Sequence, residues 1–185
     1  MPLVPSLVRV VLVPWWVAAL IVASSSASAL AQGVPQGTEQ PALPSRWACR
    51  LIPVASVRPV VEKGMERSEI IRRQCEELAA AQAVVVLEWG VMDSQSHART
   101  AMEMRAGRVV ASVKLPALGD TIVLMAHELQ HVIEQTRGLN LRAEAKRAGS
   151  GVWQSFVGSY ETQAAIDVSR QVAQELRAYS RAPRK

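Results

Sequence analysis

The sequence predicts an α+β domain in which a small, mainly antiparallel sheet packs on two long helices. Three observations support this class. Helical apolar spacing is present at residues 68–81, three strand-like stretches follow within 84–115, and two further helical stretches span about 120–137 and 159–179. No internal repeat is evident. The expected order is therefore helix, three strands, helix, loop and helix.

The first 31 residues have the composition of a signal peptide. Arg9 supplies a positive charge, residues 10–23 form an uncharged apolar run, and a stretch of small residues follows. Ala29 and Ala31 match the minus-three and minus-one positions of a signal-peptidase site, which predicts cleavage after Ala31 and a periplasmic or secreted protein. The alternative is an uncleaved N-terminal helix that anchors the domain outside the cytoplasm.

The mature chain begins with a short lead-in. Residues 32–46 contain two glycines and three prolines in a polar context, which predicts a flexible segment. The ordered domain is expected to span residues 47–185. After cleavage, the sequence predicts no stable membrane span, because no comparable apolar run follows.

The charge of the chain is basic but dispersed. Its net charge is +5, yet the basic residues are scattered among acidic ones and no run of Lys or Arg exceeds two. Few aromatic side chains remain in the mature chain to stack on bases. We therefore expect a solvated basic surface and no nucleic-acid partner.

Two cysteines, Cys49 and Cys75, belong to the predicted mature chain. An oxidising compartment allows such a pair to form a disulfide, which would close a loop of about 26 residues. The alternative is a pair of unlinked core cysteines, because Cys75 shares an apolar helical face with Ile71 and Leu78. The sequence leaves both states open.

The first predicted helix begins at a capping residue. Ser68 precedes the acidic Glu69, and Ile71, Cys75 and Leu78 then recur at helical spacing. This combination predicts a helix that runs to about residue 81.

Three strands are predicted after this helix. Residues 84–89 form a β-branched apolar run, and residues 98–105 and 108–115 alternate between apolar and charged side chains. Ala106-Gly107 lies between the last two as a turn, so they should form a hairpin. The half-buried face of the first hairpin strand is expected to carry Ala98, Thr100, Met102 and Met104.

Two helices are predicted in the second half of the chain. Asp120 is placed to cap a helix that runs to about Arg137 and stops at Gly138. Residues 138–157 have no strong period and several glycines, which predicts a loop, and the last helix follows over about 159–179.

The helix after Asp120 contains the sequence H-E-L-Q-H at 127–131, an H-E-x-x-H pattern. Residues four apart lie one above the other on a helix, so His127 and His131 can reach one cation, while Glu128 can reach a water on it. Zinc suits imidazole ligands, and it lowers the pKa of bound water so that a nearby carboxylate can take its proton. The pattern predicts one Zn²⁺ per chain, with Glu128 as catalytic acid and base.

A third ligand is needed for a tetrahedral site. Glu134 follows His131 on the same helix, where three successive groups cannot readily converge on one ion, so we interpret it as a support for a ligand or a surface residue. Glu161 is expected to lie on the face of the last helix that carries Ala165 and Val168, where a carboxylate is costly unless a cation faces it. The alternative is an exposed acidic residue favoured by the helix dipole. We predict that Glu161 is the third ligand.

These two segments resemble the gluzincin-type zinc metallopeptidases, which pair an H-E-x-x-H helix with a downstream Glu. H-E-L-Q-H at 127–131 and Y-E-T-Q-A-A at 160–165 carry the resemblance, which covers about 40 of the 185 residues. It implies a minimal zincin-like domain, zinc held by His127, His131 and Glu161, and a hairpin strand that pairs with an extended substrate. Position 165 departs from the family, because it is Ala where an acidic partner for a ligating His is expected.

Two residues are candidates to stabilise the transition state. Tyr160 adjoins Glu161, and His97 opens the hairpin, so either could reach a developing oxyanion. The alternatives are a packing role for Tyr160 and a solvated surface position for His97.

The predicted function is that of an exported hydrolase, a zinc-dependent metallopeptidase that cleaves peptide or protein substrates by metal-activated water. The alternative is a non-catalytic envelope protein in which zinc stabilises the fold and a groove binds a peptide or partner.

Overall fold

The computed structural model of the 185-residue chain describes residues 47–90, 98–156 and 159–182. All of them belong to one compact unit, Pro41–Lys185. The predicted signal peptide and lead-in lie outside the described residues. Among the described residues, no helix combines the length and the apolar composition that crossing a membrane requires.

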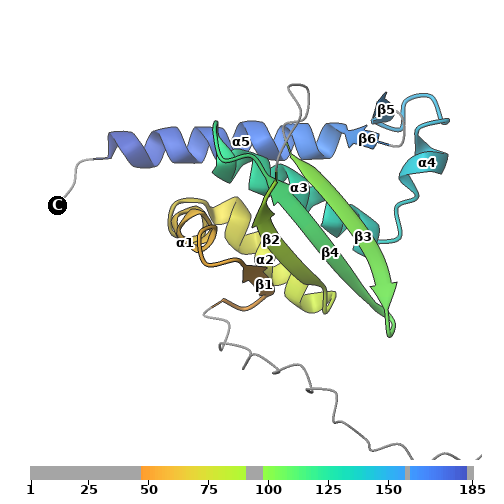
Figure 1. The fold of residues 1–185 in the computed structure, drawn as a ribbon. Coiled ribbons are helices and arrows are strands. Elements are labelled where there is room, and N and C mark those ends of the chain that lie inside the picture. Colours follow the sequence, from red (N-terminus) through yellow and green to blue (C-terminus); the bar gives the residue numbers. More distant parts are fainter. Residues whose placement is uncertain (1–46, 91–97, 157–158, 183–185) are drawn as a thin grey trace, which may run out of the picture. The chain divides into compact units, whose positions relative to one another are not determined.

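A four-stranded sheet contains β1 (Arg50–Pro53), β2 (Val84–Trp89), β3 (Arg99–Arg105) and β4 (Arg108–Leu115), as Figure 1 shows. Its order is β1-β2-β4-β3, with parallel pairs β1–β2 and β2–β4 and an antiparallel pair β3–β4. The predicted α+β class is confirmed, but this sheet is mixed rather than mainly antiparallel. The difference comes from β1, a four-residue strand too short to show a period, which joins β2 in parallel through a helical crossover.

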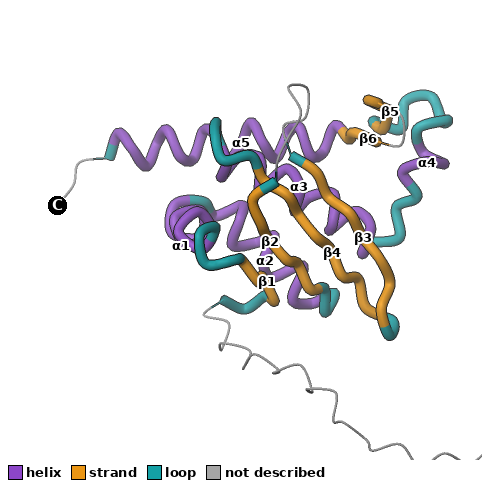
Figure 2. The backbone as a smooth tube through the Cα atoms, viewed as in Figure 1, coloured by secondary structure: helices purple, strands orange, loops and turns teal. Residues whose placement is uncertain are grey.

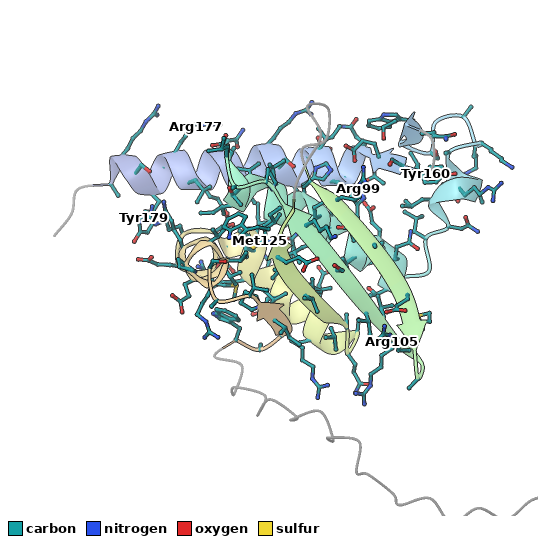
Figure 3. The ribbon with its side chains drawn as sticks, viewed as in Figure 1. Arg99, Arg105, Met125, Tyr160, Arg177 and Tyr179 are labelled. Carbon is teal, nitrogen blue, oxygen red and sulfur yellow. A yellow bond between two sulfur atoms is a disulfide. The ribbon has the colours of Figure 1, made fainter. Side chains whose placement is uncertain are left out.

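The hairpin of β3 and β4 is confirmed. Ala106 and Gly107 both have positive φ, 47° and 75°, which suits a tight two-residue turn between the strands. The expected alternation holds at Thr100 and Met102, which are half-buried, but it is wrong at Met104, which is 66% exposed. Met104 lies next to the hairpin tip, where Figure 3 places Arg105 away from the helices.

Helices α1 (Arg58–Arg67) and α2 (Glu69–Ala80) connect β1 to β2. The prediction of α2 is confirmed, and the Ser68 hydroxyl caps it by accepting the backbone N–H of Ile71 at 3.2 Å. The sequence does not predict α1, which contains Gly64 and is weakly periodic. A Cβ at this position would come within 2.9 Å of the Met125 Cε atom on the neighbouring helix, so any larger residue would require that flexible side chain to shift.

Helix α3 (Thr121–Thr136) lies in the centre of the molecule, behind the sheet in Figure 1. It contacts α1, α2, β3, β4 and the last helix. Asp120 precedes it as predicted, but its side chain makes no capping hydrogen bond, so that part of the prediction is wrong. The helix ends just before Gly138, whose positive φ of 81° confirms the predicted stop.

The loop predicted over residues 138–157 is wrong in part, and Figure 2 shows structure there: helix α4 (Leu141–Glu144) and strand β5 (Val152–Phe156). Strand β6 (Ser159–Thr162) pairs with β5, and helix α5 (Gln163–Arg181) starts only after it. Helix α4 and strands β5 and β6 are too short for a recognisable period. The late start of α5 has a local cause, because the Thr162 hydroxyl caps it by accepting the Ala165 N–H at 3.0 Å.

The core lies between the sheet and helices α1, α2, α3 and α5. Cys49 and Cys75 are both buried in it and form a disulfide, with their Cα atoms 5.0 Å apart. The unlinked alternative is therefore wrong. On the chain-entropy model such a loop contributes roughly 3 to 4 kcal/mol. The bond ties the start of the domain to α2. The largest fully buried side chains include Ile71, Leu78, Leu87, Leu115, Leu129 and Ile133.

Candidate metal centre

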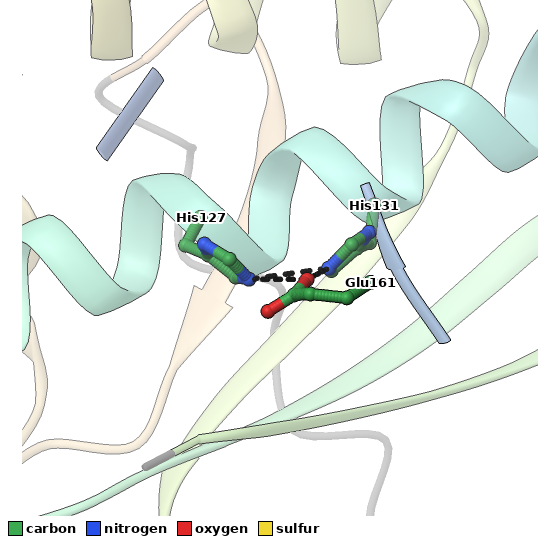
Figure 4. A group of neighbouring side chains, drawn as sticks. All are labelled: His127, His131 and Glu161. Atoms are coloured by element: carbon green, nitrogen blue, oxygen red, sulfur yellow. Dashed lines mark hydrogen bonds and ion pairs between the residues drawn. The ribbon is translucent and has the colours of Figure 1, made fainter. Parts of the chain in front are cut away.

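Three side chains converge at the middle of α3, as Figure 4 shows. The Nε2 atoms of His127 and His131 are 3.2 Å apart. The Glu161 Oε1 atom lies 3.0 Å from Nε2 of His127 and 2.9 Å from Nε2 of His131. Two of these residues come from adjacent turns of α3 and one from β6. This is the trio that the sequence predicts, and its spacing could hold a metal ion.

The second nitrogen of the His127 ring shows which atom is free to bind a cation. His127 Nδ1 lies 3.0 Å from the Ser169 hydroxyl, and that hydroxyl donates to the Ala165 carbonyl at 2.9 Å. Because the Ser169 proton is engaged, we assign the ring proton to Nδ1, which donates to Ser169. The Nε2 lone pair of His127 then points toward Glu161.

His131 is oriented in the same way by a carboxylate. Its Nδ1 atom lies 3.2 Å from Glu134 Oε2, which can only accept, so we assign the proton to Nδ1. The two Nε2 atoms and Glu161 Oε1 are then three acceptors within hydrogen-bond distance of one another. Such a cluster requires a cation or an added proton between its members.

Electrostatics favour a positive charge at this position. Burial opposes a charged His131, but its hydrogen bonds to Glu134 and Glu161 and the charge of Glu128 outweigh burial and raise its pKa from 6.5 to about 9. Burial would likewise raise the pKa of Glu161, but the hydrogen bonds and charge of His127 and His131 lower it from 4.5 to about 2. The site thus stabilises a carboxylate facing a cationic centre.

Glu134 supports the ligand His131 and does not lie at the surface. It is only 6% exposed, and its Oε1 accepts a hydrogen bond from the Thr162 hydroxyl at 2.8 Å. Of the two interpretations that the sequence left open, the supporting one is confirmed by these contacts. Glu134 therefore links α3 to the residue after Glu161 and takes the place of an acidic partner at position 165.

Sequence reasoning missed the role of Ser169. This residue lies on the face of α5 that carries Ala165 and Val172, both buried. A hydroxyl on that face could have been noticed as a polar residue within an apolar stripe. Its pairing with His127 could not have been predicted, because it depends on how α5 crosses α3.

Glu128 lies on a neighbouring face of α3 and is 7% exposed. The Thr100 hydroxyl on β3 donates to its Oε2 atom at 2.5 Å. Within the described residues, Oε1 of Glu128 has no hydrogen-bond partner. One carboxylate oxygen is therefore held by the sheet while the other is free to exchange a proton.

Glu161 reaches the site from a strand and not from a helix. The prediction that it heads the buried face of the last helix is wrong, because β6 includes it and α5 begins at Gln163. The residue is nevertheless in the predicted trio. Strand β6 is antiparallel to β5, and Glu161 lies directly opposite Trp153.

The predicted transition-state stabiliser Tyr160 does not join this cluster. Successive strand residues project from opposite faces, so Tyr160 leaves β6 on the face opposite Glu161. Figure 3 shows it at the end of the molecule that carries α4. His97 lies outside the described residues.

Comparisons of this chain with protein-family models, curated proteins and solved structures gave no match.

Proposed function

We propose that the protein is an exported zinc-dependent metallopeptidase. One observation carries the proposal: three acceptor atoms of His127, His131 and Glu161 converge on the helix that carries the buried Glu128, whose charge acts on His131 and whose second oxygen is free. The cluster alone would suit a structural ion. The adjacent, immobilised carboxylate is what supports hydrolysis.

The donor set favours zinc over other ions. Two imidazoles and one carboxylate are typical zinc ligands, whereas magnesium and calcium prefer sites made of oxygen. Three protein ligands leave a fourth position open, which is the arrangement of catalytic rather than structural zinc sites. The hydrogen bonds from Nδ1 of both rings keep each Nε2 free for the ion.

The chain's own residues can then perform the proton transfers. Zinc, when bound, supplies a Lewis acid that lowers the pKa of water toward about 7. Glu128 accepts a proton at its free oxygen and delivers it to the leaving amine. Thr100 fixes the other oxygen and thereby holds the carboxylate in one orientation.

The sheet offers a place for an extended peptide. Strand β3 ends the order β1-β2-β4-β3, so one of its edges pairs with no other strand of the described residues. Thr100, which binds Glu128, belongs to this same strand. A peptide that added to the edge of β3 as a further strand would therefore pass the proposed acid and base.

A second function has its own support. The three ligands join α3 to β6, so a bound ion would also stabilise the fold of a non-catalytic peptide-binding protein. Replacement of Glu128 by Gln separates the two functions, because this residue is outside the ligand trio.

The test is metal analysis of the mature protein together with cleavage of a peptide library, with and without a chelator. We expect about one zinc per chain, cleavage that the chelator abolishes, and a loss of at least about 100-fold in Glu128→Gln with unchanged zinc content. Glu76→Gln, at an exposed position on α2, is the matched control and should keep full activity. If zinc-loaded wild type cleaves no peptide and the chelator changes only its melting temperature, the non-catalytic function replaces the peptidase.

A further inference from the structure

Trp153 occupies an unusual position on the small β5–β6 sheet. It lies directly opposite Glu161 in the antiparallel pair. Directly opposed residues project from the same face with Cβ atoms roughly 5 Å apart. The indole therefore stands on the face of the sheet that carries the third ligand, beside the metal position.

The opposite face of this sheet carries the buried end of β6. Thr162 projects there, is 2% exposed, and binds Glu134. Val152, its partner on β5, is half-buried. A tryptophan serving only to stabilise the sheet would be expected beside these two side chains, yet Trp153 is on the other face and remains 39% exposed.

The chemistry of the indole face indicates what it would contact. Glu161 is the only charged residue of β5 and β6, and its charge is directed at the histidine pair. The indole is therefore the apolar surface that these strands place next to the metal position, and they add no other charge there. Such a surface favours a large apolar or aromatic side chain and disfavours a small polar one.

We propose that Trp153 is a specificity-determining residue that contacts a large apolar side chain of the substrate next to the bond that is cleaved. The inference rests on the proposed peptidase function and adds the substrate class, peptides with a large apolar residue flanking the scissile bond. Trp153 is neither a proposed zinc ligand nor the proposed acid and base. Its loss should therefore change substrate selectivity and not zinc binding.

The first experiment compares kcat/KM for two groups of matched peptides. The apolar peptides carry Leu or Phe at the positions flanking the cleaved bond, and the polar peptides carry Ser there. We expect zinc-loaded wild type to prefer the apolar peptides by at least about ten-fold. Trp153→Ala should reduce this preference to within about two-fold, and Trp153→Phe should retain most of it, because an aromatic face remains. Leu118→Ala removes a more exposed apolar side chain, 85% exposed, and should leave the preference unchanged.

A second readout does not depend on turnover. In the Glu128→Gln background, binding of the same labelled peptides is measured by fluorescence anisotropy, with and without Trp153→Ala, at equal zinc content. The added substitution should weaken binding of the apolar peptides about ten-fold and leave the Ser peptides nearly unchanged.

The outcomes separate this inference from the proposed function. If wild type cleaves no peptide, the peptidase function fails, and the binding measurement alone decides the role of Trp153. If Trp153→Ala lowers the values for apolar and Ser peptides equally, the residue is structural and the inference is wrong. An unchanged preference in Trp153→Ala overturns it as well.

Discussion

The candidate metal centre draws its proposed ligands from two regions that differ in how firmly they are held. Helix α3 contacts α1, α2, α5, β3 and β4, and its buried residues include His131, Glu128 and Glu134. The β5–β6 sheet packs mainly on α4 and on α5, and the described side chains of β5 are half-buried or exposed. Two ligands are thus placed by the core, whereas Glu161 is placed by a short two-stranded element.

This difference indicates what the metal adds to each region. The histidines are oriented by Ser169 and Glu134 whether or not an ion is bound. Glu161 depends on the pairing of β6 with β5, on the contact of Thr162 with Glu134, and on its own hydrogen bonds to the two histidines. A bound ion should therefore stabilise the β5–β6 sheet more than it stabilises α3.

The largest expected effect is the loss of a ligand from the firmly held region. His127→Ala removes one of three protein ligands, and since zinc sites contribute roughly 10–16 kcal/mol in total, one ligand accounts for about 4 kcal/mol, or roughly a thousand-fold in affinity. Because the helix is held by the core, the metal-free variant should still unfold cooperatively, with a melting temperature lowered only by the loss of the hydrogen bonds of His127 to Ser169 and Glu161. Chelator competition and calorimetry measure the two quantities. Unchanged zinc affinity would exclude His127 as a ligand.

A similar contrast, between long elements and very short ones, explains which parts of the fold could be predicted from the sequence. Helix α2 and the β3–β4 hairpin were predictable because each combines a local signal with a full apolar repeat. Ser68 caps the helix, and Ala106-Gly107 forms the turn of the hairpin. Strands β1, β5 and β6 and helix α4 have four or five residues, too few for a period, and tertiary partners determine them.

The candidate site follows the same rule. His127, Glu128 and His131 could be identified because their spacing on one helix is itself the geometry. Glu161 was identified with an incorrect local structure, since a carboxylate can reach the same ion from a strand or from a helix. The pairing of Ser169 with His127 depends on the crossing of two helices that are far apart in sequence, which no local pattern encodes.

The second prediction concerns the pH dependence of the metal-free protein. The pKa of His131 is raised from 6.5 to about 9, so its contribution is fully present below pH 6.5 and is lost as pH rises through about 9. The pKa of Glu161 is lowered from 4.5 to about 2, so its contribution is present above pH 4.5 and is lost as pH falls through about 2. The two groups therefore stabilise the metal-free fold most between about pH 4.5 and 6.5.

Urea unfolding in a chelator should show this as a loss of up to about 3 kcal/mol between pH 6.5 and 9.5. The matched control is His131→Asn, in which this loss should be absent, so the difference between the two proteins isolates the histidine. Zinc requires His131 without its added proton, so zinc should stabilise wild type more at pH 9 than at pH 6. A metal-free stability that rises from pH 6.5 to 9.5 relative to His131→Asn would contradict the assignment.

The third prediction has the smallest effect and tests the comparison itself. Removal of zinc should speed amide hydrogen exchange in β5 and β6 by at least about ten-fold, because Glu161 then keeps only its hydrogen bonds to the two histidines and few other contacts hold these strands. Amides in the buried part of α3 should change by less than about two-fold, since its packing does not involve the ion. The β3–β4 hairpin, which supplies no ligand, is the internal control.

The measurement is hydrogen-exchange mass spectrometry of zinc-loaded and chelated protein, and of His127→Ala in both conditions. The variant should behave as chelated protein throughout. Equal acceleration in α3 and in the β5–β6 sheet would show that the core does not place the histidines independently of the metal, and the contrast between the two regions would then be wrong.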